Sequence, residues 1–462
     1  MKRRLPGTRK KSGLKIVLGL LLIVVAGGAG YIYTAAEFER EAPSIEVQES
    51  LYWNKKVPLQ ITLKDNRGLK NFELLLSDGK NNLVIGKGEI AGTPQEQILK
   101  ISYPKSNLID PNATHLMLRV SVDDSSLWNL FRGNHAQKTI DIHIDDKSPS
   151  VSVLANTRTV TQGGSALVVF AAEDENMDSL TIEAAGEKFK AVPYKKEGYY
   201  AALIAWPFLK NEFSGEIIAT DKAGNSRKTH IPFYIKQHKY KVSWIEAKDS
   251  FIDGKITDLA SSDPEYSKDD KLEKLRAINE TMRLKNEDLI HSLGRKLSEK
   301  MINAWHIDKF YPLKNGQKVA SFGDERHYYY KTQDQEVSHS YHLGYDLAST
   351  KMATIQTSNP GTVVFAGENG IYGNMPMIDH GLGLYTLYGH CSKFLVSNGE
   401  QVKAGDAIAQ TGTTGLALGD HLHFGVLVQG VEVRPVEWFD THWIKTNIDD
   451  VLKEADKIIE GK

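Results

Sequence analysis

The sequence predicts a mainly β chain preceded by one transmembrane helix. Three observations support this: an uncharged apolar run near the N-terminus, period-two apolar alternation through the first half, and short glycine-bounded strands near the end. We expect two β-sandwich modules at 43–146 and 148–238, a helical segment at 246–309 and an antiparallel β domain at 310–446. A short exposed helix is expected at 447–462.

The N-terminus combines a basic tail with an apolar run. Residues 1–15 hold seven Lys or Arg residues, and the 21 residues of 16–36 carry no charge. As a helix this run would span about 32 Å, close to the ~30 Å hydrocarbon core of a bilayer. The positive-inside rule then places the tail in the cytoplasm and the body of the protein in the periplasm. A cleavable signal peptide is the alternative, and we favour a retained single-pass inner-membrane anchor.

Composition excludes several classes of protein. The net charge of the 462 residues is −1, so no overall field favours nucleic acid as a partner. Cys391 is the only cysteine, so the chain has neither an internal disulfide nor a cysteine-rich zinc site. A metal ion would have to be held by His, Asp and Glu.

The two predicted β modules show a weak internal repeat. Five apolar positions of the first module recur about 108 residues later; they are Leu59, Ile61, Leu69, Phe72 and Leu74, opposite Leu167, Val169, Met177, Leu180 and Ile182. The turn at 221–225 resembles the late hairpin of bacterial immunoglobulin-like domains. We therefore expect two immunoglobulin-like modules, with one larger irregular β domain as the alternative.

A charged segment from Ser267 to Met301 follows. It lacks proline, and its apolar residues recur at helical spacing: Leu272, Leu275, Met282, Leu289, Leu293 and Leu297. We expect an amphipathic helix that breaks near Gly294 and packs on a neighbouring domain.

Histidines concentrate near the C-terminus. Eight of the 15 lie between His327 and His442, and two of them, His421 and His423, flank one leucine. In a strand, residues i and i+2 point to the same face, which suits a metal ion, a catalytic pair or one of each. Two ordinary surface histidines are the alternative.

Upstream residues extend this pattern. His342 and Asp346 could share a metal if the chain bends between them, and Gly344 permits a bend. With one His of the pair they make a two-His, one-carboxylate set that leaves a fourth position for water, as in catalytic zinc sites. His390 adds a further histidine, and non-ligand histidines could move protons in amide hydrolysis.

The ordered set His-x-x-x-Asp, Tyr-x-His and His-x-His resembles the lysostaphin-like (LytM-type) zinc endopeptidases of bacterial cell walls. The resemblance covers roughly 321–440. It implies that one zinc ion is held by His342, Asp346 and His423, and that His390 and His421 are the catalytic pair. Asn374 is expected to line the substrate groove.

The implied reaction is hydrolysis of peptide bonds in peptidoglycan stem peptides or cross-links. Similar members are membrane-anchored periplasmic enzymes, so peptidoglycan and the inner membrane are the expected partners. The β modules could bind a regulatory protein. A catalytically silent scaffold or activator of other wall hydrolases is the alternative function.

Two further residues near these motifs are not expected to take part in catalysis. Cys391 replaces a leucine that is common in the family, and we expect it to be a small buried apolar residue. His339 competes with His342 as first ligand but lacks an Asp four residues later.

Overall fold

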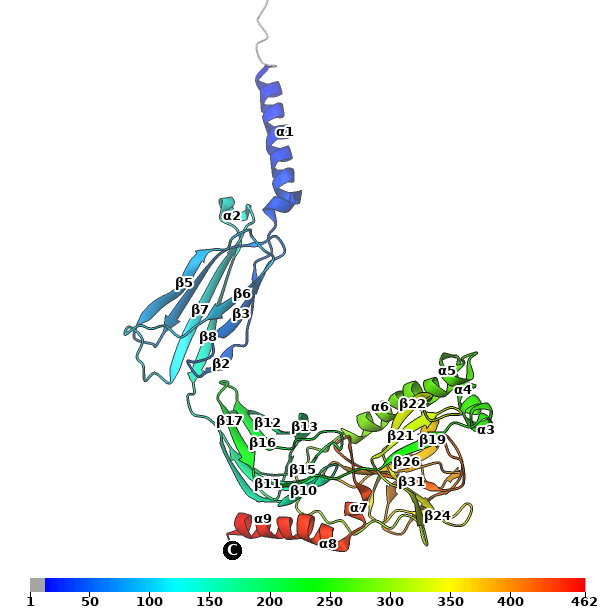
Figure 1. Ribbon diagram of the computed structural model, residues 1–462. Helices are drawn as coiled ribbons and strands as arrows, with labels where there is room; N and C mark the ends of the chain where they lie inside the picture. Colours follow the sequence, from blue (N-terminus) through cyan, green and yellow to red (C-terminus); the bar gives the residue numbers. More distant parts are fainter. Residues whose placement is uncertain (1–12, 462) are drawn as a thin grey trace, which may run out of the picture. The chain divides into compact units, whose positions relative to one another are not determined.

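The computed structural model describes residues 13–461, which divide into two compact units. The first unit comprises Met1–Lys147 with Lys222–Asn225, and the second comprises Ser148–Asp221 with Ser226–Lys462. Figure 1 shows their helices and strands. Most of the predicted basic tail, 1–15, lies outside the described residues.

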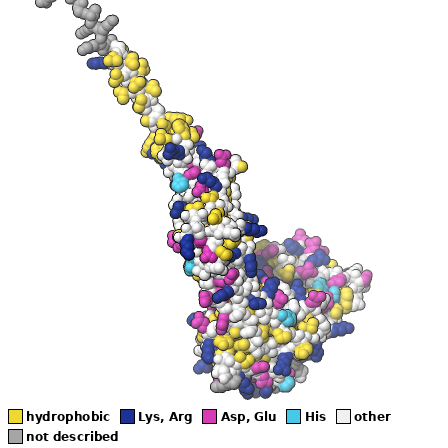
Figure 2. Space-filling model, turned by 90° about the vertical axis from the view of Figure 1, so that its left-hand side faces the viewer, with side chains coloured by type: hydrophobic (Ala, Val, Ile, Leu, Met, Phe, Trp, Pro, Cys, Tyr) yellow, Lys and Arg dark blue, Asp and Glu magenta, His cyan; other side chains and the backbone are white. Residues whose placement is uncertain are grey.

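Helix α1, Gly13–Thr34, is the predicted apolar segment. It has 22 residues, its most apolar 18-residue window has a mean hydropathy of 2.3, and none of its residues is buried. Figure 2 shows the hydrophobic side chains that cover this helix. The helix is long and apolar enough to cross a membrane, and a signal sequence has the same properties. The apolar helix is therefore confirmed, and its retention as an anchor stays a prediction.

The first β module consists of two sheets around one apolar core. One sheet has the order β1-β3-β6 and the other β2-β8-β7-β4-β5. Along β7, inward residues alternate with outward ones, so Leu116, Leu118 and Val120 are buried. The elements are η1 (Ala36–Phe38), β1 (Ser44–Glu46), β2 (Ser50–Trp53), β3 (Leu59–Lys64), β4 (Leu69–Ser77), β5 (Asn82–Glu89), β6 (Glu96–Ile101), β7 (His115–Asp124), α2 (Trp128–Phe131) and β8 (His135–Ile144).

The second β module also has two main sheets. Their orders are β14-β15-β11-β9 and β13-β12-β16-β17, and β10 pairs with β18 beside them. The strands are β9 (Ser150–Asn156), β10 (Thr159–Thr161), β11 (Ser165–Glu173), β12 (Met177–Ala184), β13 (Glu187–Lys190), β14 (Val192–Pro193), β15 (Tyr199–Ala205), β16 (Gly215–Asp221), β17 (Ser226–Ile231) and β18 (Tyr234–Lys236).

The two modules share a strand order. The antiparallel run β1-β3-β6 corresponds to β9-β11-β15, and β5-β4-β7-β8 corresponds to β13-β12-β16-β17. The 108-residue repeat aligns β3 with β11 and β4 with β12. This agrees with the predicted duplication, while the immunoglobulin-like assignment stays a prediction.

The helical segment packs against the C-terminal domain. Its continuous helical run, Lys271 to Gly294, ends at Gly294, as expected, and buries Leu275, Ile278 and Ile290 in one cluster with Tyr372 and Met377. The elements are α3 (Asp249–Phe251), η2 (Ile252–Ile256), α4 (Thr257–Ala260), η3 (Pro264–Tyr266), α5 (Lys271–Arg276), η4 (Ala277–Met282) and α6 (Arg283–Gly294).

The C-terminal domain is built on an 8-stranded sheet, ordered β20-β23-β31-β27-β26-β25-β29 with β32 beside β31. Two 3-stranded sheets, β19-β21-β22 and β24-β30-β28, flank it. The elements are β19 (Val242–Glu246), β20 (Gln317–Ala320), β21 (Asp324–Tyr329), β22 (Glu336–His342), β23 (Tyr345–Ala348), β24 (Thr354–Gln356), β25 (Gly361–Glu368), η5 (Gly370–Tyr372), β26 (Asn374–Asp379), β27 (Leu384–Gly389), β28 (Lys393–Phe394), β29 (Gln401–Val402), β30 (Ala407–Gln410), β31 (Leu422–Val428) and β32 (Val431–Val433).

The chain ends in short helices that join the second module to the C-terminal domain. These are α7 (Pro435–Trp438), α8 (Thr441–Ile444), η6 (Lys445–Asp449) and α9 (Asp450–Glu460). Helix α9 packs on β9 and β11, with Val451, Leu452 and Ile459 buried. The prediction of an exposed terminal helix is therefore wrong, because its apolar stripe covers the second module.

Candidate active site

Three predicted ligands meet at the ends of three strands. His342 ends β22, Asp346 lies in β23, and His423 lies in β31 directly opposite Asp346. Asp346 Oδ1 is 3.0 Å from His342 Nε2 and 2.9 Å from His423 Nδ1, and those two nitrogens are 3.0 Å apart. The sheet register thus brings together residues that are 77 positions apart in the sequence.

A sharp bend between β22 and β23 makes this meeting possible. A side chain at Gly344 would place its Cβ 2.4 Å from His423 Cε1 and Nε2. Only glycine lets the backbone pass so close to the imidazole. The predicted bend at Gly344 is confirmed, and close approach is its reason.

The electrostatics of the cluster suit a metal ion. Burial raises the pKa of Asp346, but His342 and His423 outweigh it and hold the pKa well below the ordinary value, so the carboxylate is ionised. Burial lowers the pKa of His423 to about 4 despite Asp346, so its imidazole is neutral. His342 Nδ1 donates to Ser321 O at 2.8 Å, so Nε2, which faces Asp346, is the nitrogen that a metal ion would take.

This donor set fits zinc. Bonds of about 2.0–2.1 Å in a tetrahedral site place ligand atoms about 3.3 Å apart, close to the separations found here. Two neutral imidazoles and one carboxylate are typical zinc ligands, and the set forms a compact buried group.

His390 and His421 lie beside the cluster. Their ring centroids are 4.7 Å apart, and His421 Nε2 is 3.7 Å from Asp346 Oδ2. His390 Nδ1 donates to Thr414 O and His421 Nδ1 to Gly419 O, which leaves the second nitrogen of each ring available for proton transfer.

The backbone of His390 has φ +64, a left-handed conformation that is strained for a non-glycine residue. Its amide donates to Tyr372 O at 2.7 Å, which helps to hold this conformation. Burial, together with His423 and His421, holds the pKa of His390 well below the ordinary value. The imidazole is therefore neutral.

All five histidine and aspartate side chains line one cleft of about 940 Å³. The cleft also has walls that the sequence analysis did not identify; they include Ser243, Trp244, Arg326, Tyr372, Leu418 and Asp420. Trp244 belongs to β19, which went unpredicted; burial alternates along this strand, but the adjacent apolar residues Trp244 and Ile245 break the period-two pattern in the sequence.

The structure also locates the other residues that the sequence singled out near the site. Asn374 begins β26, and its backbone amide donates to Thr414 Oγ1. It is not among the residues that line the cleft, so its binding role stays a prediction. Cys391 is fully buried in the apolar core, in agreement with a packing role. His339 lies in a different cluster from His342.

Comparison with known proteins identifies relatives of this domain. Residues 340–435 match Peptidase family M23. DD-carboxypeptidase/endopeptidase Mpg of Neisseria meningitidis serogroup B is 39% identical over 95 residues, 21% of this chain and 22% of that protein. Peptidoglycan DD-endopeptidase ShyA of Vibrio cholerae is 34% identical over 126 residues, 27% of this chain and 28% of that protein.

Among solved structures, the catalytic domain of lysostaphin from Staphylococcus simulans is 26% identical and covers 27% of this chain and 92% of that chain, with a TM-score of 0.23. The alignments with the two curated relatives span less than a third of either protein. The family match confirms the resemblance that the histidine motifs indicated.

Proposed function

We propose that this chain, whose residues 340–435 belong to Peptidase family M23, is a zinc-dependent endopeptidase that hydrolyses peptide bonds in peptidoglycan. The observation that carries the proposal is the complete set of five side chains, His342, Asp346, His423, His390 and His421, in a single cleft. The names of the relatives from Vibrio and Neisseria support a DD-endopeptidase, which cuts peptide cross-links.

The five residues divide into three that would hold the metal ion and two that would take part in proton transfer. His342, Asp346 and His423 would hold zinc, which when bound polarises the scissile carbonyl and lowers the pKa of water. One ring of the pair His390 and His421 accepts the proton of the attacking water through its free nitrogen. The other ring donates a hydrogen bond to the developing oxyanion once its free nitrogen also carries a proton, and the proton taken from the water then passes to the leaving amine.

The scaffold alternative finds less support. A silent relative would be free to lose ligands or the catalytic histidines, and here each of the five is present and oriented toward the others.

We further propose that α1 is a retained anchor and that the enzyme works in the periplasm on the wall. The length and apolar character of the helix support this, together with the basic residues that precede it in the sequence. The first β module would set the distance from the membrane or bind a regulatory protein. Deleting 43–146 from the anchored chain tests this role, and unchanged activity and localisation in cells would count against both.

The decisive experiment uses the full chain purified in detergent. We expect it to release fragments from purified peptidoglycan and to cut defined cross-linked muropeptides, to stop after chelation and to recover with Zn²⁺. Asp346→Ala should be inactive and lose its tightly bound zinc. A chain that binds zinc and folds but leaves every muropeptide intact would refute the enzyme and support the scaffold.

Two single variants separate the roles of the His-x-His pair. His423→Ala should lose zinc and activity together. His421→Ala should keep zinc and lose turnover by about 10²–10⁴-fold, the usual contribution of a general acid or base. Zinc analysis and initial rates distinguish them, and equal loss of metal in both would show that the division of the pair is wrong.

A further inference from the structure

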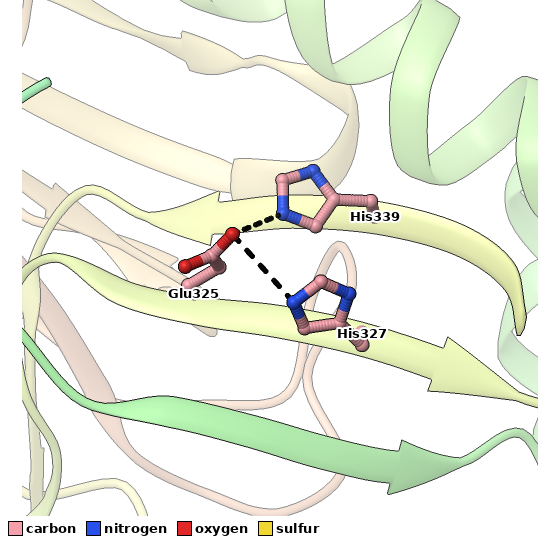
Figure 3. Close-up of side chains that lie close together, drawn as sticks. All are labelled: Glu325, His327 and His339. Atoms are coloured by element: carbon pink, nitrogen blue, oxygen red, sulfur yellow. Dashed lines mark hydrogen bonds and ion pairs between the residues drawn. The ribbon is translucent and has the colours of Figure 1, made fainter. Parts of the chain in front are cut away.

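A second cluster of histidines lies on the strand pair β21–β22, outside the catalytic group (Figure 3). Glu325 and His327 share one face of β21, and His339 lies directly opposite His327 on β22. Glu325 Oε1 is 3.1 Å from His339 Nε2 and 3.6 Å from His327 Nε2. Both imidazoles therefore point toward the same carboxylate oxygen.

The cluster is distinct from the catalytic site although β22 serves both. Side chains alternate along β22, so Ser338, Ser340 and His342 are buried while His339 and Tyr341 are half-buried on the other face. The catalytic cluster lies on the buried face. The second cluster, which we call the outer cluster (Glu325, His327 and His339), lies on the opposite face.

The tautomer of His327 is set by a further carboxylate. His327 Nδ1 donates to Glu336 Oε1 at 2.8 Å, so Nε2, which faces Glu325, is the nitrogen that could bind a metal ion. A carboxylate behind a histidine is the usual outer support of a metal-binding imidazole. Trp244 stacks on the same ring, with centroids 4.5 Å apart and planes at 16°, and fixes its orientation.

The spacing of the donor atoms fits a metal ion as well as ion pairing, and all three lie within 4.8 Å of one another. Ligand atoms of a tetrahedral zinc site are about 3.3 Å apart, and the two separations from Glu325 lie on either side of that value. A histidine that merely pairs with a carboxylate needs no second imidazole at the same oxygen. Glu325 and Glu336 also give the cluster a negative potential that favours a cation.

We propose that Glu325, His327 and His339 form a second metal site that takes one divalent transition ion, Zn²⁺ in the first instance. The three side chains are one-fifth to one-third exposed, so water completes the coordination shell and the ion exchanges with solvent. The ion would bridge β21 and β22, and β22 also carries His342 into the cleft, three residues after His339.

The test is zinc stoichiometry on the full chain in detergent, stripped of metal and titrated against a chromophoric chelator. Wild type should bind two equivalents, and His327→Ala/His339→Ala should bind one. Asp346→Ala/His423→Ala should also bind one, and the variant with all four changes none. The matched control is His135→Ala, which removes an exposed cross-strand histidine that pairs with Asp123 alone; it should still bind two.

Trp244 supplies an independent readout. In the Asp346→Ala/His423→Ala background, Co²⁺ should quench the tryptophan fluorescence of the ring stacked on His327, and Trp244→Phe should remove that quenching. One equivalent in wild type, or two in His327→Ala/His339→Ala, would overturn the proposal whatever the outcome with peptidoglycan. Loss of wall hydrolysis with two equivalents retained would instead refute only the proposed function.

Discussion

The two β modules share a strand order but differ in what completes their cores. Every buried apolar residue of the first module's core comes from that module, from Trp53 to Ile142. The core of the second module is continuous with that of the peptidase domain, so Leu203 and Trp206 belong to the same cluster as Phe424 and Trp438. The same topology thus serves once as a self-contained module and once as part of the body that holds the candidate active site.

Polar contacts support this difference. Gln429 Nε2, from the turn between β31 and β32, donates to Lys190 O and Leu203 O. Glu437 of α7 accepts a hydrogen bond from the amide of Ser165 at 3.1 Å. Backbone groups of the second module are therefore satisfied by peptidase side chains, which a separable module would not require.

The largest expected effect comes from deleting one module or the other. Removing 148–238 should leave the peptidase insoluble and unable to bind zinc, because it exposes the shared core. Removing 43–146 should leave zinc binding and hydrolysis of soluble muropeptides intact. Solubility, zinc content and rate measure this, and an active soluble chain without 148–238 would show that the second module is separable.

A matched pair of core truncations should give the next largest effect. Leu118→Ala and Leu203→Ala each remove a fully buried side chain from a central strand, and each should cost about 2–5 kcal/mol. Calorimetry should show that Leu118→Ala lowers the temperature of one unfolding transition. Hydrolysis should persist after that transition. Leu203→Ala should lower the temperature at which hydrolysis is lost. If both variants shifted the same unfolding transition, the predicted difference between the two modules would be wrong.

Glu437 should make the stability of the second unit depend on pH. Burial raises the pKa of this carboxyl from 4.5 to about 7, against the opposing effects of Arg434 and Ser165. The stability associated with its neutral form is complete below pH 4.5 and is lost as pH rises through 7, by at most about 3 kcal/mol. Urea unfolding of wild type and Glu437→Gln should therefore diverge between these values, and parallel curves would contradict this.

The smallest effect should come from one ion pair at the same junction. Asp456 of α9 lies 2.7 Å from Lys195 Nζ and also accepts a hydrogen bond from Tyr194. Asp456→Asn keeps an acceptor for Tyr194 but removes the charge, so we expect a loss of about 0.2–1 kcal/mol from the second unit. The control is Glu73→Gln, which breaks the ion pair with Lys87 in the first module. It should not change the unfolding transition at which hydrolysis is lost.

Local patterns carried much of the prediction. Period-two alternation and the 108-residue repeat located β3, β4, β11 and β12. An uncharged run located α1, and helical spacing located α6 with its end at Gly294. These features depend on neighbours within one strand or helix, so they can be read along the chain.

Much of the candidate site could also be predicted from the sequence. His342, Asp346 and His423 were named from motifs alone, and the bend at Gly344 was expected from its residue type. The cleft walls at Trp244 and Tyr372 were not predicted, because they come from elements far apart in the sequence. The outer cluster was missed for the same reason, since only the register of β21 and β22 joins His327 to His339.

The sequence by itself determined which side chains are available and which strands and helices they occupy, since short-range periodicity and residue chemistry suffice for that. Tertiary structure alone decided three things: that Asp346 lies opposite His423, that one β module closes its own core while the other shares the peptidase core, and that α9 is covered. Each depends on long-range register and packing, where the free energy comes from burying surfaces that no local pattern pairs.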